Sequence, residues 1–230
     1  MQQKVIYKPF TAHCDRVTGK NFYHDGNYNI RDPRFYALVQ PLRKSLEERL
    51  NIPTEELAPI RVRIQNHIDT VFYLGKLYDP ALDFSEHDMS KMYDEFEDIG
   101  YIDMERFQTS IIYLSRDGYY SPDLEWAQKA CIKHHKITNP HHPEFYGGNI
   151  DLMPDIRIIE MTDDWHSMAL EKMVRNPNIK TPDTLDYYKN KALPKYQFNI
   201  YQQSLIMDSI KLFAEKTDMK MIHKIWHKTK

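Results

Sequence analysis

The chain has 230 residues, 41% of them hydrophobic and 13% aromatic, which is enough for one well-packed domain. Its formal net charge of −2 leaves no basic excess to replace the counterions of a nucleic-acid backbone, which argues against nucleic acid as the main partner. No apolar run approaches the about 20 residues of a membrane span, and the polar start Met1–Lys4 does not resemble a secretory signal. Two isolated cysteines, Cys14 and Cys131, favour a reducing compartment, so we expect a cytoplasmic protein.

Residues 1–53 are expected to form an arm and a first helix that pack on the main domain, residues 54–230. Turn-forming residues dominate residues 1–32, which predicts irregular backbone there. Asp32 is a good N-cap residue and a proline follows it, so a helix with one apolar stripe is expected over Pro33–Leu50.

A second helical pattern begins at Thr54, is expected to be interrupted by Pro59, and runs on to Leu74 with a strongly apolar stripe. The pair Asp79-Pro80 should end this helix. His67 falls on the buried stripe. A lone histidine in that position is more often a core side chain bonded to a carbonyl than a metal ligand, so both interpretations stay open.

The adjacent pair His87 and Asp88 is expected to lie on a helix for which Ser85 is a plausible N-cap. Neighbouring residues differ by about 100° around a helix, so both side chains can lean towards one point at its edge. Lys91 would share their face. Its ammonium group would either neutralise a carboxylate or hold a phosphate group of a substrate.

Histidines crowd together after a predicted helix that starts at Ser121 and follows the motif-free residues 94–121. Four of the eleven histidines fall within nine residues: His134, His135, His141 and His142. Unpaired imidazoles are costly to bury and imidazolium ions repel one another, so a divalent metal is the commonest reason to gather them. The alternative is a loop with several exposed histidines.

Two acids share one face of the helix that should open at Pro154. Glu160 and Asp164 are four residues apart and therefore stack. They would form either a solvated acidic strip with Asp163 or a metal ligand with an orienting partner. Later in the chain a short helix is expected over residues 185–190. A long amphipathic helix that buries residues from position 200 onwards and a short final helix should follow.

Taken in order, these histidines and acids resemble the ligands of the HD-domain superfamily, whose helical bundle holds metal with a histidine, a His-Asp doublet and a late aspartate. Three stretches are similar to an uncharacterised HD-like family of bacteria, phages and large viruses: His87-Asp88-x-Ser90-Lys91, His134-His135-Lys136-x-x-Asn139-x-His141-His142-Pro143-Glu144 and Glu160-Met161-x-x-Asp164-Trp165. The similarity extends from about His67 to Tyr188. It implies an all-α fold, an HD-domain-like helical bundle with an irregular N-terminal arm, and the host cytoplasm if the chain is phage or viral.

The resemblance also implies a ligand set. The first metal would be held by His67, His87, Asp88 and Asp164. His135 and His142 would bind a second metal or contact the phosphoryl oxygens of a substrate, with His134 and His141 as the alternatives in each pair. The supporting residues, which would orient ligands or contact substrate, are Asn139, Glu144 and Glu160. A set rich in histidine suits Mn, Fe, Co, Ni or Zn better than Mg, and the tight seven-residue step from His135 to His142 leaves one or two ions open.

The function that these residues favour is a metal-dependent phosphohydrolase acting on a nucleotide or another small phosphate ester. Its catalytic residues would be Asp88, Lys91, His135 and His142. The alternatives are a mixed-valence di-iron oxygenase of a small molecule, which the six-ligand order fits equally well, and a binding protein without catalysis. The expected partner is a small phosphate substrate, with no membrane and no strong nucleic-acid signal, and a homodimer is compatible with the sequence.

Overall fold

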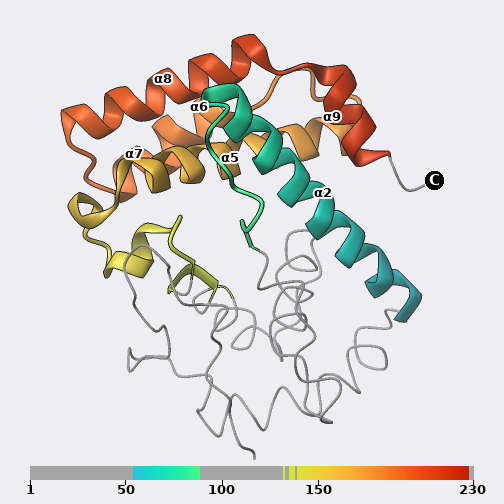
Figure 1. Ribbon diagram of the computed structural model, residues 1–230, viewed down its shortest axis with the longest axis horizontal. Helices are drawn as coiled ribbons and strands as arrows, with labels where there is room; N and C mark the ends of the chain where they lie inside the picture. Colours follow the sequence, from blue (N-terminus) through green and yellow to red (C-terminus); the bar gives the residue numbers. More distant parts are fainter. Residues whose placement is uncertain (1–53, 89–131, 133–134, 138, 228–230) are drawn as a thin grey trace, which may run out of the picture.

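The computed structural model describes residues 54–88, 132, 135–137 and 139–227 (Figure 1). The described residues form helices and turns and contain no strand, which confirms the all-α prediction. The expected helix over residues 33–50, the loops of residues 94–121, and the candidate site residues Lys91 and His134 lie outside the described residues.

Three long helices build the bundle. They are α2 (Thr54–Tyr78), α5 (Asp155–Arg175) and α8 (Ile200–Lys216). Helix α5 contacts both α2 and α8, and the short α9 (Met219–Trp226) closes the bundle against α2 and α5 beside the C-terminus (Figure 1). No helix among the described residues has the length and apolar character needed to cross a membrane.

Helix α5 is the central element, because every side chain from Ile158 to Ser167 is buried. Pro154 precedes its first turn, and it ends before Asn176-Pro177, where a proline cannot continue a helix. Six of these ten residues are polar, so their bonding groups must be satisfied inside the protein. The centre of the bundle is therefore a place for polar chemistry as well as apolar packing.

Apolar packing fixes the loop that follows α2. Phe84 packs with Val71 and Ile159 in one core cluster. Its ring lies directly over Gly75, where an added Cβ would meet Phe84 Cδ2 at 2.6 Å. Gly75 thus allows the loop to approach the helix closely, and this contact places residues 87 and 88 beside α2.

Shorter elements complete the described chain. They are η4 (Pro143–Tyr146), η5 (Ile150–Leu152), α6 (Thr184–Tyr187), the π-helical η6 (Tyr188–Ala192) and α7 (Leu193–Lys195). The helix predicted over residues 185–190 therefore continues through α7. Helix α8 begins with a capping box between Asn199 and Gln202, but Ile200, which was expected to be buried, is 87% exposed because it lies in the first turn, on the outer side.

Two local predictions were wrong. Pro59 does not interrupt α2, which is continuous from Thr54. A proline removes only one backbone hydrogen bond, and the packing of the rest of the helix outweighs that loss. Residues 85–88 form a turn rather than a helix, in which His87 N–H donates to Phe84 O. Within this turn Asp83 Oδ1 accepts a hydrogen bond from Ser85 N–H, so Ser85 is not the N-cap that was expected.

Candidate metal centre

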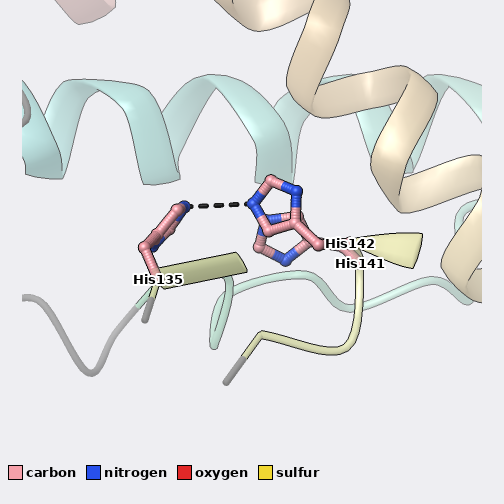
Figure 2. Close-up of side chains that lie close together, drawn as sticks. All are labelled: His135, His141 and His142. Atoms are coloured by element: carbon pink, nitrogen blue, oxygen red, sulfur yellow. Dashed lines mark hydrogen bonds between the residues drawn. The ribbon is translucent and has the colours of Figure 1, made fainter. Parts of the chain in front are cut away.

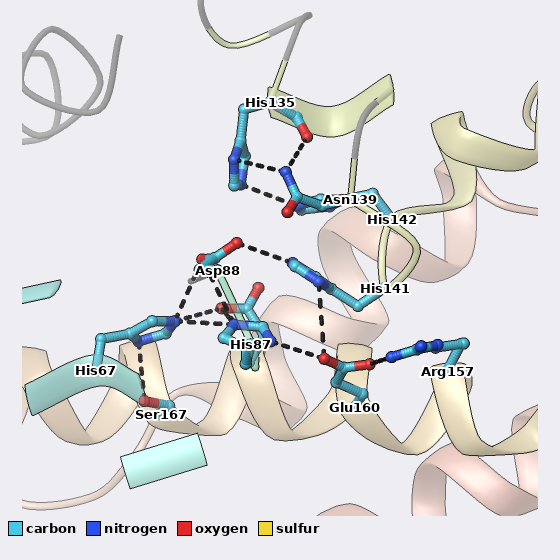
Figure 3. A network of polar contacts seen from close by, with 11 residues as sticks. His67, His87, Asp88, His135, Asn139, His141, His142, Arg157, Glu160 and Ser167 are labelled. Carbon is cyan, nitrogen blue, oxygen red and sulfur yellow. Dashed lines mark hydrogen bonds and ion pairs between the residues drawn. The ribbon is translucent and has the colours of Figure 1, made fainter. Parts of the chain in front are cut away.

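His67 lies on the inward face of α2, where it is 2% exposed. Its Nδ1 is 3.0 Å from Ser167 Oγ on α5, and its Nε2 is 3.1 Å from Asp164 Oδ1 on the same helix (Figure 3). Asp164 and Ser167 are three residues apart and so lie on one face of α5. The histidine is therefore held from both ring nitrogens by α5, and its partners are side chains, not a backbone carbonyl.

His87 and Asp88 reach the same point from the turn after α2. Asp88 has φ of 52°, the left-handed region that aspartate enters more readily than most residues. This backbone conformation excludes the helix that was predicted here, and it turns the Asp88 carboxylate towards α2 and α5. His87 Nε2 is 3.5 Å from Asp88 Oδ2 and 3.2 Å from His67 Nε2.

These four residues, His67, His87, Asp88 and Asp164, are called the aspartate cluster below. The longer separations within it are 3.8 Å from His87 Nε2 to Asp164 Oδ1 and 3.9 Å from His67 Nε2 to Asp88 Oδ2. Donors at about 2.1 Å from one ion lie about 3.0 Å apart as octahedral neighbours and about 3.4 Å apart in a tetrahedron. The separations of 3.1–3.9 Å that involve these two histidines are close to both, so donors from His67, His87 and Asp88 can share one cation, with Asp164 beside both imidazoles.

Glu160 lies one turn before Asp164 and supports the cluster from behind. Its Oε1 is 3.0 Å from His87 Nδ1, and its Oε2 accepts a hydrogen bond of 2.5 Å from Arg157 Nη1. Burial alone would raise the pKa of Glu160, but His87 and Arg157 outweigh it and lower that pKa. A carboxylate behind a histidine fixes the orientation of the ring and its tautomer. Glu160 lies in this position behind His87, as its predicted orienting role requires.

A second group, called the histidine cluster below, consists of His135, His141 and His142 (Figure 2). His135 Nε2 and His142 Nε2 are 3.0 Å apart, and Asn139 Nδ2 lies 3.2 Å from His135 Nδ1. The pair His135 and His142 therefore meets as predicted, and Asn139 is next to it.

His141 is the member that faces the aspartate cluster. Its Nε2 is 3.8 Å from Asp88 Oδ1, and its ring lies 4.2 Å from that of His87, centroid to centroid (Figure 3). His141 is 2% exposed, and its Nε2 has no hydrogen-bond partner among the described residues. A buried, unpartnered imidazole nitrogen pointing at a carboxylate suits a cation between them. This position belongs to His141, which was only the alternative to His142.

Charges within the site are strongly coupled. Burial opposes a proton on His87, but Asp88, Asp164 and Glu160 outweigh it and raise the pKa of His87 to about 10. Burial lowers the pKa of His67, and it lowers the pKa of His141 well below its usual value. Asp164 is held well below its usual pKa, because His67 and His87 outweigh the effect of its burial. The site therefore holds carboxylates in the charged form that a cation requires.

Glu144 belongs to a separate network of polar side chains. Its Oε1 accepts hydrogen bonds from Lys195 Nζ at 2.6 Å and from the Tyr196 hydroxyl at 2.8 Å, and it lies 3.5 Å from Lys136 Nζ. Burial works against it, but Lys195 and Lys136 lower the pKa of Glu144 to about 2. This network ties η4 to the end of α7.

Sequence reasoning missed several polar residues around the site. Ser167 and Arg157, which hold His67 and Glu160, carry no signal beyond their helical spacing from Asp164. His166 Nδ1 meets Thr184 Oγ1 at 2.8 Å away from the clusters, and burial lowers its pKa to about 4. Asp163 is fully buried rather than part of a solvated strip, and burial raises its pKa well above the usual value.

A family model matches residues 58–224, which is most of the chain and includes both clusters. The chain belongs to the DUF5662 family. This family is described as one of unknown function. Comparisons with the curated proteins and with the solved structures give no match. The chemistry of this DUF5662 protein therefore has to be derived from its own site.

Proposed function

We propose that this chain is a metal-dependent phosphohydrolase and that its helical bundle is of the HD-domain type. The observation that carries the proposal is the convergence of the aspartate cluster, whose four donor atoms come from α2, the following turn and α5. Buried carboxylates are costly unless positive charge offsets them, so a site that gathers two of them around two imidazoles is best explained by a cation that it binds.

The donor set favours a transition metal. Two imidazoles with two carboxylates suit Mn, Fe, Co, Ni or Zn, whereas Mg prefers oxygen ligands and water. Both histidines of the aspartate cluster have an Nδ1 partner, Ser167 Oγ for His67 and Glu160 Oε1 for His87. Such partners orient Nε2 for binding, and they supply the outer contacts that metal sites usually contain.

A divalent ion in this cluster would lower the pKa of water and polarise a phosphoryl oxygen. The residues of the chain would do the rest. The pKa of His141 lies well below its usual value, so the ring is neutral at pH 7 and can accept a proton or bind a second cation. His135 and His142 share one hydrogen bond at the half-exposed side of the histidine cluster, where a phosphate group would arrive. Lys91 remains a predicted phosphate contact.

The substrate that fits is a nucleotide or another small phosphate ester. Phosphate esters carry the negative charge that a cation bound in the aspartate cluster would attract, and imidazoles beside it can donate to phosphoryl oxygens. The near-neutral net charge of the chain favours a small substrate over a nucleic-acid backbone.

The test is metal analysis followed by turnover. Protein purified without chelator should contain a transition metal, and metal-depleted protein reloaded with Mn or Co should release phosphate from members of a nucleotide panel. The Asp88→Ala variant should do neither. A wild-type protein that binds no transition metal, or that binds it and releases no phosphate from any ester, would contradict the proposal.

The histidine cluster supports one further candidate, a mixed-valence di-iron oxygenase. Two histidines of this cluster would bring the four ligands of the aspartate cluster to the six of the di-iron order, and His141 lies 3.8 Å from Asp88 Oδ1. Two irons per chain with an optical absorption band, and no phosphate release, would favour the oxygenase over the hydrolase.

A further inference from the structure

Two lysines converge on one carboxylate oxygen where η4 meets α7. Lys195 Nζ donates to Glu144 Oε1 at 2.6 Å, and Lys136 Nζ lies 3.5 Å from the same oxygen. The Tyr196 hydroxyl also donates to Oε1, at 2.8 Å, and accepts from Lys195 Nζ. One carboxylate offsets one ammonium group, so one positive charge is left unmatched among these four side chains. Lys136 and Lys195 are called the lysine pair below.

Neutralising Glu144 does not explain why both lysines lie at Oε1. The other oxygen, Oε2, is buried and has no hydrogen-bond partner among the described residues. The two ammonium groups meet at one oxygen instead of dividing between both, and at that distance they repel each other. Their side chains are 33% and 49% exposed, so a ligand arriving from solvent can reach both. An anion bound by both lysines would remove the repulsion.

The lysine pair adjoins the histidine cluster. Two side-by-side contacts join the helical turn that carries His135 to the segment that carries His142. In the first contact the two histidines meet through their Nε2 atoms at 3.0 Å. The second joins Lys136, one residue after His135, to Glu144, two residues after His142. Consecutive Cα atoms are about 3.8 Å apart, so the Cα atoms of His142 and Glu144 are at most about 7.6 Å apart.

The chain around Lys195 strengthens the positive charge. Residues 187–207 contain three lysines and no acid. Two of these lysines, Lys189 and Lys191, are exposed on η6, which leads directly into α7. Within this part of the chain no carboxylate offsets their charge, and clustered charge of one sign attracts ligands of the opposite sign. The surface beside the histidine cluster therefore favours an anion.

We propose that the lysine pair binds a second phosphate group of the substrate, so that the protein prefers diphosphate and triphosphate esters, nucleotides among them, over monophosphates. The inference rests on the proposed function and deepens it by naming the class of ester. Lysine ammonium groups bind phosphate oxygens as point charges, and two of them match the additional negative charge that a second phosphate brings. The lysine pair holds a phosphate group other than the one that is hydrolysed.

The first test measures binding without turnover. Fluorescence polarisation compares two labelled nucleotide analogues that resist hydrolysis, a methylene-bridged diphosphate and the corresponding monophosphonate, on metal-loaded protein. The diphosphate should bind more tightly. Replacing the pair (Lys136→Gln with Lys195→Gln) should lower the diphosphate affinity about tenfold or more, which is what hydrogen bonds to charged groups contribute, and the monophosphonate affinity much less. Equal losses for both analogues, or no loss for the diphosphate, would overturn the proposal.

Lys172 and Lys180 provide a matched control away from this surface. Lys172 pairs with Asp183, and Lys180 Nζ donates to Pro177 O. Replacing both with glutamine removes the same two charges and should leave both affinities unchanged. An equal loss of diphosphate affinity in this control would show an effect of net charge alone and would overturn the proposal.

Two further variants test the chemistry of the pair. Lys195→Arg keeps the charge and should keep most of the diphosphate affinity that Lys195→Gln loses. The single variant Lys195→Gln also covers the case in which the double variant fails to fold, because the side chain is half exposed. A loss in Lys195→Arg as large as that in Lys195→Gln would contradict a role for positive charge.

Turnover separates a failure of this inference from a failure of the proposed function. The double variant should raise KM for diphosphate esters more than for monophosphates, with a smaller change in kcat. Phosphate release from monophosphates with no advantage for diphosphates would refute the inference and leave the phosphohydrolase intact. Diphosphate binding that depends on the lysine pair, without phosphate release from any ester, would refute the phosphohydrolase and leave the pair as a diphosphate-binding site.

Discussion

The aspartate cluster and the histidine cluster adjoin each other but differ in charge and support. The aspartate cluster brings two carboxylates to its two histidines, and α2 and α5 hold it from both sides. Among the described residues the histidine cluster has no carboxylate of its own, and it lies on the helical residues 135–137 and on the turn at residues 140–142 that precedes η4. Because cations are attracted chiefly by the carboxylates, the aspartate cluster should fill first and bind more tightly.

Hydrogen positions sharpen this difference. Asn139 Nδ2 faces His135 Nδ1, so the neutral His135 ring carries its hydrogen on Nε2 and donates it to His142. His67 and His87 instead have their Nδ1 atoms engaged, which leaves Nε2 for a ligand role. A cation entering between His135 and His142 would have to change the His135 tautomer, which lowers its affinity relative to the first position.

The largest expected effect comes from removing the carboxylate that faces both clusters. Asp88→Ala should abolish metal binding and turnover, and Asp88→Asn should weaken binding more than about 100-fold while keeping a residue that tolerates a positive φ. Metal content measured by mass spectrometry checks both variants. His135→Gln should keep the first ion, and an equal loss in His135→Gln would erase the distinction between the clusters.

Asp163→Asn is the matched control for Asp88→Asn. Burial raises the pKa of Asp163 well above the usual value, which favours the neutral carboxyl, and asparagine is a near-isosteric replacement for that form. Metal affinity in this variant should equal that of the wild type. A loss comparable to that of Asp88→Asn would mean that any acid on this part of the bundle contributes to binding.

Metal affinity should rise with pH. With a pKa of about 10, His87 carries a proton at neutral pH in the absence of metal, and Nε2 must release it to bind. The proton stabilises the metal-free fold below the unfolded pKa of about 6.5, and this contribution disappears as pH rises through about 10. First-ion affinity should therefore increase about tenfold per pH unit between pH 6 and 8.

Calorimetry in two buffers of different ionisation enthalpy counts the protons. One proton should leave with the first ion. An affinity that is independent of pH over this range would contradict the assignment of His87 as a ligand.

Gly75→Ala should weaken the aspartate cluster indirectly. The new Cβ would lie 2.6 Å from Phe84, and the loop carrying His87 and Asp88 would have to move away from α2. Overpacking of this kind costs about 1–3 kcal/mol of stability, and metal affinity should fall with it. Denaturant unfolding and metal titration check both effects. Adding Phe84→Leu to Gly75→Ala should restore part of the stability and part of the metal affinity. If neither recovers, the strain does not come from the contact with Phe84.

Glu144→Gln should have the smallest effect and spare metal affinity. The lowered pKa of Glu144 stabilises the fold above the unfolded pKa of about 4.5, and this contribution is lost as pH falls through about 2. The side chain is partly exposed and screened, so the loss at pH 7 should be about 1 kcal/mol or less. Unfolding curves at pH 7 and pH 3 measure the free energy of unfolding of both proteins, and the difference between them should be smaller at pH 3. A drop in metal affinity would connect Glu144 to the histidine cluster.

Helical periodicity predicted much of this site. The stripe containing His67 and the four-residue step from Glu160 to Asp164 both follow from helix geometry, and the described side chains lie as that geometry requires. The turn at Asp88 could not be found in this way, because a single positive φ leaves no periodic pattern and the loop is placed by the contact between Phe84 and Gly75. Ser167 was equally hidden, since a serine that bonds to a distant histidine has no local pattern.

The choice among adjacent histidines was also beyond the sequence. Side chains of neighbouring residues in a turn diverge, and only the bend at residues 139–142 decides that His141 faces Asp88 while His142 faces His135. The segment that the resemblance named lies beside the aspartate cluster, whereas the direction in which each of its histidines faces required coordinates.

Anomalous diffraction from a crystal of the protein loaded with Mn or Co tests the central claim most directly. The claim predicts a peak about 2.0–2.3 Å from His67 Nε2, His87 Nε2, Asp88 Oδ2 and Asp164 Oδ1, occupied before any second peak beside His141. The claim would be contradicted if the aspartate cluster showed no peak, or if the histidine cluster filled while the aspartate cluster stayed empty.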